Sequence, residues 1–427
     1  MTEKKWRKRT VGDRCLSPET LMMGYGYDPS LSERSLKPPV FRTSTFVFRS
    51  AQDGKEFFEL AYGLRQQRPN EEPGLIYSRI NNPDLEMLED RLAIWDAAEC
   101  TLVFASGMAA ISTTLWAYVR PGDVLLHSDP VYGGTDFLLK RILPQFGVTP
   151  VGFPAEGGPA AQAEAAQRAR GSGPVSVIYI ETPANPTNGL VDLAQSRRIA
   201  DEMGQTGRRP IIIVDNTFLG PLFQVPLTLG ADLVVTSLTK YVGGHSDLIA
   251  GSCSGRRQFL DPVRGMRTIL GTMCEPETGW LLMRSLETLR LRMTAAADNA
   301  RRVAEFLRRD KRVRSVWYLD FLPADHPDRG VFERQCKGPG STFSFEVKGG
   351  EAEAFAVLDH LEVFKLAVSL GGTESLASHP ASMTHADVSP EEKQTLGITD
   401  ALIRLSVGIE NADDLIADLD HALSVLG

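Results

Sequence analysis

Short apolar, β-branched runs alternate with segments of helical periodicity from about residue 83 onward, and this alternation limits the possible folds more than any other feature. Four runs are clear, at residues 124–127, 175–180, 211–214 and 233–236. Each run is apolar on both faces, and helical stretches separate the runs. They therefore predict central strands of a mostly parallel sheet with helices on both faces, so the expected fold class is α/β.

The chain divides by pattern into three parts. Its 427 residues exceed what a single hydrophobic core usually serves. Residues 1–76 are rich in turn formers and charge, and we expect an extended arm, with one short helix near 54–64, that packs on a neighbouring subunit. Residues 77–277 form the expected large domain, and residues 278–427 form a smaller α+β domain.

The periodicity also places individual elements. Leu85, Leu88 and Leu92 recur at helical spacing after a Pro-Asp start signal. The C-terminal part has several predicted elements, which are a long helix over 278–294 continuing through 299–309, antiparallel strands around 342–347, and a closing helix over 412–425.

Composition excludes several classes of function. Hydrophobic residues make up 42% and charged residues 23%, as in an ordinary globular protein. The net charge of −8 argues against nucleic acid or an anionic membrane as the main partner. No stretch is long and apolar enough to span a bilayer, and the basic N-terminus lacks the apolar region of a secretory signal. The five scattered cysteines have no CxxC pair, which favours reduced thiols and a cytoplasmic protein over disulfides or a zinc site.

Polar side chains occupy the positions where ligands of an open α/β sheet bind, beyond the carboxyl ends of strands. Asp215, Lys240 and Asn185 each come shortly after a predicted strand. Gly107 and Met108 open a helix, whose free N–H groups suit a phosphate. Singly, each has an ordinary explanation: a turn or cap for the carboxylate and the glycine, and a solvated surface for the lysine.

Together these residues match the needs of pyridoxal 5'-phosphate (PLP). This cofactor supplies the electron sink, and the protein supplies orientation and electrostatics. A carboxylate such as Asp215 keeps the pyridine nitrogen protonated, and a lysine such as Lys240 forms the Schiff base and then shuttles protons. The combination predicts a PLP enzyme acting on a small amino acid.

The chain resembles the Cys/Met-metabolism group of PLP enzymes, which includes cystathionine γ-synthase, cystathionine γ- and β-lyases and methionine γ-lyase. The resemblance runs from about residue 38 to the C-terminus and is carried by eight motifs in order. These are Tyr-Ser-Arg at 77–79, Ser-Gly-Met at 106–108, Val-Tyr-Gly-Gly-Thr at 131–135, Glu-Thr-Pro-Ala-Asn-Pro at 181–186, Val-Asp-Asn-Thr at 214–217, Ser-Leu-Thr-Lys at 237–240, Ser-Leu-Gly-Gly at 369–372 and Arg-Leu-Ser-Val-Gly-Ile-Glu at 404–410. It implies the type I, aspartate-aminotransferase-like fold, with a seven-stranded sheet.

The resemblance also implies roles for the cofactor site. Lys240 holds the cofactor and moves protons, Asp215 pairs with the pyridine nitrogen, and Tyr132 stacks on the ring and acts as an acid toward the leaving group. The remaining implied cofactor-binding residues are Gly107, Met108, Ser237, Thr239, Thr217 and Asn185. A tyrosine buried in the core is the alternative for Tyr132.

Other residues are implied to bind the substrate or to reach across subunits. Arg404 grips the substrate α-carboxylate as a bidentate fork, supported by Ser369 and Asn185; a surface salt bridge is the alternative. Tyr77 and Arg79 contact the cofactor phosphate of the neighbouring subunit, so a dimer with shared sites is expected, with dimers pairing into a homotetramer. No metal set is visible, and His245, His379 and His385 are expected to be structural.

The reaction within the family rests on fewer residues. The loop 369–376 resembles the γ-enzymes and lacks the aromatic residues of bacterial β-lyases. We expect γ-elimination, by a carbon–sulfur or carbon–oxygen lyase, from a γ-substituted L-2-aminobutyrate such as methionine, cystathionine or a canavanine-like γ-oxygen analogue. The products would be the leaving group and 2-oxobutanoate or a homoserine-type compound. Gly134, where methionine γ-lyases typically have cysteine, and Ile80-Asn81-Asn82-Pro83 depart from the common pattern.

Three alternatives to γ-elimination differ in how well the sequence supports them. The first is γ-replacement on an O-acylhomoserine with cysteine, as in cystathionine γ-synthase. The second is a catalytically silent binding homologue, which the joint presence of Lys240, Asp215, Tyr132 and Arg404 disfavours. The third is a nucleotide-binding dehydrogenase, which the absence of a GxGxxG motif after the first strand excludes.

Overall fold

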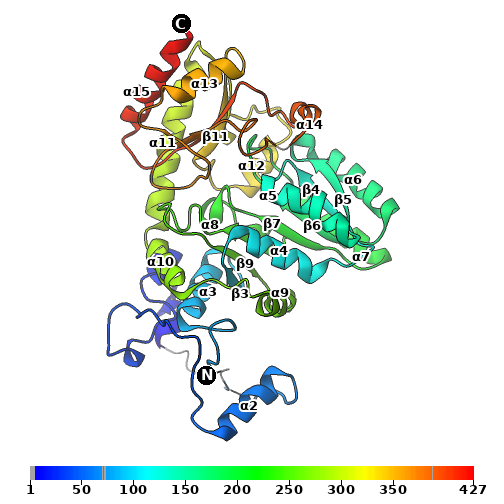
Figure 1. The fold of residues 1–427 in the computed structure, drawn as a ribbon, viewed down its shortest axis with the longest axis vertical. Coiled ribbons are helices and arrows are strands. Elements are labelled where there is room, and N and C mark those ends of the chain that lie inside the picture. The colour runs from blue at the N-terminus through cyan, green and yellow to red at the C-terminus, as the bar shows by residue number, and fades with distance from the viewer. Residues whose placement is uncertain (1–4, 70, 72–73, 387) are drawn as a thin grey trace.

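Two β-sheets organise this computed structural model, which describes residues 5–69, 71, 74–386 and 388–427. The larger sheet lies in the middle of the molecule and the smaller one in the C-terminal part (Figure 1). No helix among these described residues is long and apolar enough to cross a membrane.

The larger sheet has seven strands in the order β3-β9-β8-β7-β6-β4-β5. Their bounds are Cys100–Phe104 (β3), Gly251–Gly255 (β9), Leu233–Ser237 (β8), Ile211–Asp215 (β7), Val175–Glu181 (β6), Val124–Asp129 (β4) and Thr149–Pro154 (β5). The five strands from β8 to β5 are parallel, and β9 runs antiparallel to both of its neighbours. The predicted α/β class with a mostly parallel seven-stranded sheet is confirmed.

Alternate residues of the central strands enter different cores, which explains why the runs are apolar on both faces. Tyr179 and Ile213 face α4 (Gly107–Tyr118) and α9 (Arg257–Leu270). Ile178 and Ile212 face α6 (Gly158–Ser172) and α7 (Leu193–Thr206). Helices therefore cover both faces, and the carboxyl ends of β6, β7 and β8 remain as one edge for a site.

The smaller sheet has the order β10-β11-β14-β13-β12 and is antiparallel except for the β12–β13 pair. Its strands are Val313–Trp317 (β10), Thr342–Val347 (β11), Leu402–Ser406 (β14), Leu376–Ser378 (β13) and Lys365–Leu366 (β12). Helices α11 (Leu289–Arg309), α13 (Glu351–Asp359) and α15 (Ala412–Leu423) pack on it and bury its apolar residues.

The long helix predicted over 278–309 is divided into α10 (Pro276–Leu286) and α11. The buried Arg292 accounts for the break. Its guanidinium donates to the carbonyl of Ser285 at the end of α10, at 3.0 Å, and to the carbonyls of Tyr241 and Val242. The side chain of Arg292, in the first turn of α11, thus bonds both to a loop of the large domain and to the end of α10, at the point where the two helices separate.

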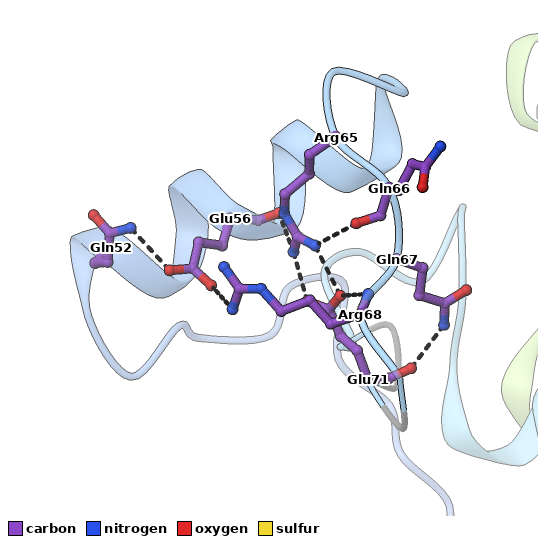
Figure 2. A network of polar contacts seen from close by, with 7 residues as sticks. All are labelled: Gln52, Glu56, Arg65, Gln66, Gln67, Arg68 and Glu71. Atoms are coloured by element: carbon purple, nitrogen blue, oxygen red, sulfur yellow. Dashed lines mark hydrogen bonds and ion pairs between the residues drawn. The ribbon is translucent and has the colours of Figure 1, made fainter.

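The N-terminal part lies partly against the large sheet region and partly away from it (Figure 1). Leu21, Met22 and Tyr27 are buried in a core shared with α3 (Pro83–Trp95) and α10. Helix α2 (Ala51–Ala61), the helix expected near 54–64, has no fully buried residue. Figure 2 shows that a polar network ties α2 to the following segment, with Arg65 and Arg68 bonded to Glu71 and Glu56.

The remaining elements are short. They are β1 (Thr10–Val11), β2 (Arg14–Cys15), α1 (Pro18–Leu21), α5 (Gly133–Phe137), α8 (Gly220–Phe223), α12 (Arg329–Gln335) and α14 (Pro390–Thr395), a π-helical turn at Leu138–Ile142, and 3₁₀ turns at Lys5–Arg7, Pro29–Leu31, Leu143–Phe146, Ala155–Gly157, Pro226–Leu229, Leu319–Phe321 and Ser424–Leu426.

Candidate active site

A cavity of about 680 Å³ lies beyond the carboxyl ends of the central parallel strands, where residues of the C-terminal sheet close it. The predicted site residues that line it are Gly107, Met108, Tyr132, Asn185, Asp215, Thr217, Ser237, Thr239, Lys240, Ser369 and Arg404. Every predicted site residue except Tyr77 and Arg79 is thus brought to one place, although these residues are spread over almost 300 positions of the chain.

Lys240 follows the end of β8 and extends into this cavity. Its Nζ donates to the hydroxyl oxygen of Ser369 at 2.6 Å. Burial lowers the pKa of the Lys240 amine to about 8, and the nearby charge of Arg404 lowers it further in the same direction. A substantial fraction of the amine is therefore neutral near physiological pH, as a lysine that bonds to an aldehyde requires.

Asp215 is the last residue of β7 and is buried. Its Oδ1 accepts from the N–H and the hydroxyl of Thr217, at 3.0 and 2.6 Å, and its Oδ2 accepts from the Tyr179 hydroxyl at 3.2 Å. Burial nevertheless raises the pKa of the carboxyl. Its hydrogen bonds within the described residues come only from the uncharged Thr217 and Tyr179, and a protonated pyridine nitrogen fits beside this buried carboxylate.

The opposite end of the cavity has the features of a phosphate site. Ser106 caps α4, and its hydroxyl oxygen accepts from the Ala109 N–H at 3.0 Å. A Cβ on Gly107 would lie 2.8 Å from the Cβ of Ser237, so only glycine lets the helix start approach the end of β8 this closely. The Thr239 hydroxyl bonds to the main chain of Ala250, which holds the loop in place. Helix N–H groups and adjacent hydroxyls together suit a phosphate.

Arg404 lies on β14 and is almost completely buried, at 3% exposure. Its Nη1 donates to the side-chain oxygen of Asn185 at 3.0 Å, and its Nη2 donates to the carbonyl of Ser369 at 2.9 Å. Its Nε has no partner, and burial lowers the pKa of the guanidinium to about 10. A surface salt bridge is thereby ruled out, and the group is suited to bind an anionic ligand in the cavity.

Tyr132 is 46% exposed and lines the cavity, so it is not a core tyrosine. Its main-chain N–H donates to Glu181 Oε2 at 2.7 Å. A Cβ on Gly134 would lie 2.8 Å from the Tyr132 ring and 3.2 Å from the sulfur of Met108. The glycine therefore lets the ring lie close to the start of α5.

Tyr77 and Arg79 lie outside this cavity. Tyr77 is 39% exposed and forms a bridge with Thr45, and Arg79 donates to the carbonyl of Thr268 at 2.6 Å. The Arg79 guanidinium carbon is 5.6 Å from the centre of the Tyr77 ring. The pair is presented at the surface of its own chain.

Two buried residues of β6 also contact the site, although the sequence analysis assigned them no role. Tyr179 donates to Asp215, and Glu181 accepts from the N–H groups of Tyr132 and Asn185. In the sequence, Tyr179 is an interior residue of a predicted strand, and Glu181 is the first residue of a family motif. The feature that could have identified them is a polar side chain near the carboxyl end of an otherwise apolar, buried strand.

Histidines contribute no metal site. His245 bonds to the carbonyl of Gly243, and His379 bonds to Ser382 and to the carbonyl of Asp400. His385 bonds to the hydroxyl of Thr384. Within the described part of the chain, no group of three or more histidine, cysteine or acidic residues could hold a metal ion.

The fold and this cavity define a PLP-dependent enzyme of the type I fold, because a lysine, a buried carboxylate and a phosphate-ready helix start converge at one edge of the sheet. The chain belongs to the Cys/Met metabolism PLP-dependent enzymes, whose family model matches residues 19–424.

Known proteins of similar sequence and structure agree. The chain is 40% identical over 406 residues to the L-methionine gamma-lyase of Pseudomonas putida, covering 95% of this chain and 96% of that protein. It is 40% identical over 365 residues to the cystathionine gamma-lyase of Mus musculus, covering 85% and 88%. The cystathionine gamma synthase of Xanthomonas oryzae pv. oryzae, solved in complex with cystathionine, superposes with a TM-score of 0.85 at 33% identity, covering 96% of this chain and 98% of that one.

Proposed function

We propose that this enzyme catalyses γ-elimination from a γ-substituted L-2-aminobutyrate, releasing the γ-substituent and an oxo acid. The observation that carries the proposal is that Ser369 binds both Lys240 and Arg404. The amine that moves protons and the guanidinium that binds an α-carboxylate are therefore held on either side of one residue, as an α-amino acid requires. The similarity to methionine and cystathionine gamma-lyases supports a γ-substituted substrate.

Each side chain has a part that follows from its position. Bound PLP supplies the electron sink that lets protons leave the substrate α- and β-carbons. Arg404 binds the α-carboxylate and thereby fixes the orientation of the α-carbon. Lys240, with its lowered pKa, accepts a proton at Nζ and delivers it elsewhere on the substrate.

Tyr132 and Asp215 complete the machinery. The Tyr132 ring, open to the cavity, packs over the cofactor position, and its hydroxyl donates a proton to the departing γ-group. Asp215 would pair with the protonated pyridine nitrogen, whose charge, together with the donors of Thr217 and Tyr179, would offset the cost of burying the carboxylate. Gly107, Met108, Ser237 and Thr239 surround the phosphate.

The test of γ-elimination is oxo acid release from a panel of L-methionine, L-cystathionine, an O-acyl-L-homoserine and L-canavanine. Release from at least one substrate, together with its free leaving group, is expected. If none of them yields an oxo acid with the fully loaded enzyme, γ-elimination is wrong.

γ-Replacement is the second candidate, because solved cystathionine gamma synthases are similar over nearly the whole chain. It is distinguished by adding L-cysteine to an O-acyl-L-homoserine assay. An elimination enzyme continues to make oxo acid, whereas a replacement enzyme makes thioether faster than oxo acid. A silent homologue would do neither.

We also propose that two chains share their active sites, with Tyr77 and Arg79 reaching the cofactor phosphate of the partner, and that such dimers pair into a tetramer. The position of this pair outside its own cavity, with Tyr77 exposed, supports the idea, as does helix α2, which has no fully buried residue. Five free thiols, Cys15, Cys100, Cys253, Cys274 and Cys336, favour a cytoplasmic setting.

Subunit mixing tests the shared site. Lys240→Ala and Arg79→Ala subunits, each inactive alone, are co-expressed with different affinity tags. One site of each mixed dimer then has both native residues, so random pairing restores about a quarter of wild-type activity. Recovery of none in isolated mixed dimers would contradict shared sites.

A further inference from the structure

A buried carboxylate connects two loops of the active site. Glu181 is the last residue of β6, is 5% exposed, and lies opposite Asp215 in the register of β6 and β7. Its Oε2 accepts from the main-chain N–H of Tyr132 at 2.7 Å, and its Oε1 accepts from the main-chain N–H of Asn185 at 3.2 Å. One side chain therefore bonds to the loop that follows β4 and to the loop that follows β6.

The two loops serve different parts of the site. The Tyr132 loop begins α5 and carries the ring that faces the cavity. The Asn185 loop carries the amide oxygen that accepts from Arg404 at 3.0 Å. A shift of either N–H group changes the separation between the aromatic ring and the guanidinium, because both are anchored to the same carboxylate.

Stability alone does not account for an acid at this position. Burial, followed by the neighbouring charge of Asp215, raises the pKa of Glu181 to about 8, against the two N–H donors and the charge of Arg404. An ionisable group beside another buried carboxylate costs folding free energy, and a neutral side chain would avoid that cost. The geometry of two accepted main-chain bonds is what the carboxylate provides.

We propose that Glu181 is a positioning residue, which sets the distance between Tyr132 and the Asn185–Arg404 pair by bonding to both loops. This role rests on the proposed function, in which Arg404 binds the substrate carboxylate and Tyr132 acts on the leaving group. Glu181 lines the cavity, and it acts on the Tyr132 ring and on Arg404 through its bonds to the two loops.

The two bonds predict an asymmetric effect of Glu181→Gln. Glutamine has nearly the same shape, but one acceptor oxygen becomes a donating NH₂ group. The remaining oxygen keeps the shorter bond to Tyr132, so the NH₂ group faces the N–H of Asn185, donor against donor. The Asn185 loop then moves and loosens Arg404, and KM rises about tenfold while kcat changes less than about threefold.

A second buried carboxylate provides the matched control. Asp418 of α15 is 6% exposed and accepts from the main-chain N–H groups of Glu362, Val363 and Phe364, at 2.7–3.0 Å. It lines no part of the cavity. Asp418→Asn makes the same chemical change in the C-terminal domain, and it is expected to lower thermal stability without altering kcat or KM.

The deciding measurement uses both variants as purified, cofactor-loaded enzymes. Besides kinetics, binding of L-2-aminobutyrate, which has no leaving group, is followed through the change in cofactor absorption. For Glu181→Gln the dissociation constant is expected to rise about tenfold, and for Asp418→Asn it should stay at the wild-type value. Because this readout needs no turnover, it stands even if the wild-type enzyme fails every elimination assay.

Two results would overturn the proposal. One is a Glu181→Gln enzyme whose dissociation constant and KM match those of Asp418→Asn, since Glu181 would then be only structural. The other is a lower kcat with unchanged KM and ligand affinity, since the Asn185 loop would then not depend on Glu181. Should Glu181→Gln fail to fold, Glu181→Asp, which keeps the carboxyl group but cannot span both N–H groups, is put through the same comparison.

Discussion

Folding shifts the pKa values of charged side chains in opposite directions in the cavity and in the N-terminal arm. In the arm, Arg65 bonds to Glu71 and lowers the pKa of that carboxyl to about 2 (Figure 2). In the cavity, burial raises the pKa of Glu181 to about 8 and lowers that of Lys240 to about 8. Folding thus favours the charged form of a glutamate in the arm, whereas in the cavity it favours the neutral forms of a glutamate and a lysine.

The difference comes from water and from the available partners. The arm network lies at the surface, where each carboxylate has an arginine and solvent lowers the cost of both charges. In the cavity, the hydrogen bonds of Asp215 and Arg404 within the described residues go to uncharged groups, although both residues are buried. Unmet charge of this kind marks a place where ligands supply the missing partners.

The largest expected effect is that of Lys240→Ala. Loss of the amine removes both the covalent attachment and the proton carrier, so kcat/KM falls at least about a thousandfold. Activity assays, and borohydride trapping followed by mass spectrometry, measure the two consequences. Lys348→Ala, at an exposed position, is the control and should keep both activity and trapped cofactor. A trapped cofactor in the Lys240→Ala enzyme would disprove the assignment.

Arg404→Lys is expected to raise KM about a hundredfold, because an ammonium cannot form the two parallel bonds of a guanidinium and the site is buried. Cofactor absorption should persist, since Arg404 faces the substrate. The same replacement at the half-buried Arg65 of the arm, far from the cavity lining, should leave KM unchanged. Equal effects of the two replacements would break the contrast between the regions.

The pH dependence of cofactor uptake tests the lowered pKa of Lys240. Only the neutral amine attacks an aldehyde, and its fraction grows as pH rises through the pKa. With a pKa of about 8, the rate of reconstitution of apoenzyme should rise about tenfold from pH 7 and level off above pH 9. Stopped-flow absorption gives the rate. A rate that still increases about tenfold from pH 8 to pH 9 would show an amine with an ordinary pKa.

Tyr179→Phe removes one of three hydrogen bonds to Asp215. The hydroxyl lowers the pKa of Asp215, so its loss raises that pKa and weakens the partner of the pyridine nitrogen. We expect cofactor affinity to fall about threefold to tenfold, measured by titration of apoenzyme. Tyr318→Phe, a buried tyrosine of the C-terminal domain, serves as the control. Unchanged affinity in Tyr179→Phe would mean that Thr217 alone suffices.

Glu71→Gln should have the smallest effect. The pKa of its carboxyl is lowered to about 2, so the group is ionised at neutral pH, and an ion pair near the surface contributes little. Folding lowers this pKa, so the contribution of the pair is present at neutral pH and is lost progressively as pH falls from 4.5, the ordinary value, through about 2. We expect faster amide exchange in residues 62–69 with unchanged kcat. A large loss of activity would show that the arm network supports the partner's site.

Local patterns in the sequence carried much of this structure. Buried runs such as 211–214 specify parallel strands because both faces of each strand meet a helix layer. Asp215 and Lys240 could be placed at a common edge because parallel strands end together. The family motifs then predicted further residues of the cavity lining, including Tyr132, Ser369 and Arg404.

Contacts between distant segments could not be obtained in this way. The break between α10 and α11 depends on carbonyls of Tyr241 and Val242, about 50 positions from Arg292. Periodicity records which face of a helix is buried, but it does not record which group a buried polar atom meets.

The sequence by itself determined the α/β class, the cofactor and the residue types at the sheet edge, because burial and spacing are written along the chain. Only the tertiary structure decided that Glu181 joins Tyr132 to Asn185, that Tyr179 supports Asp215, and that Tyr77 and Arg79 lie outside their own cavity. Hydrogen bonds depend on ångström-scale placement of atoms from separate elements, and that placement exists only after the elements have packed.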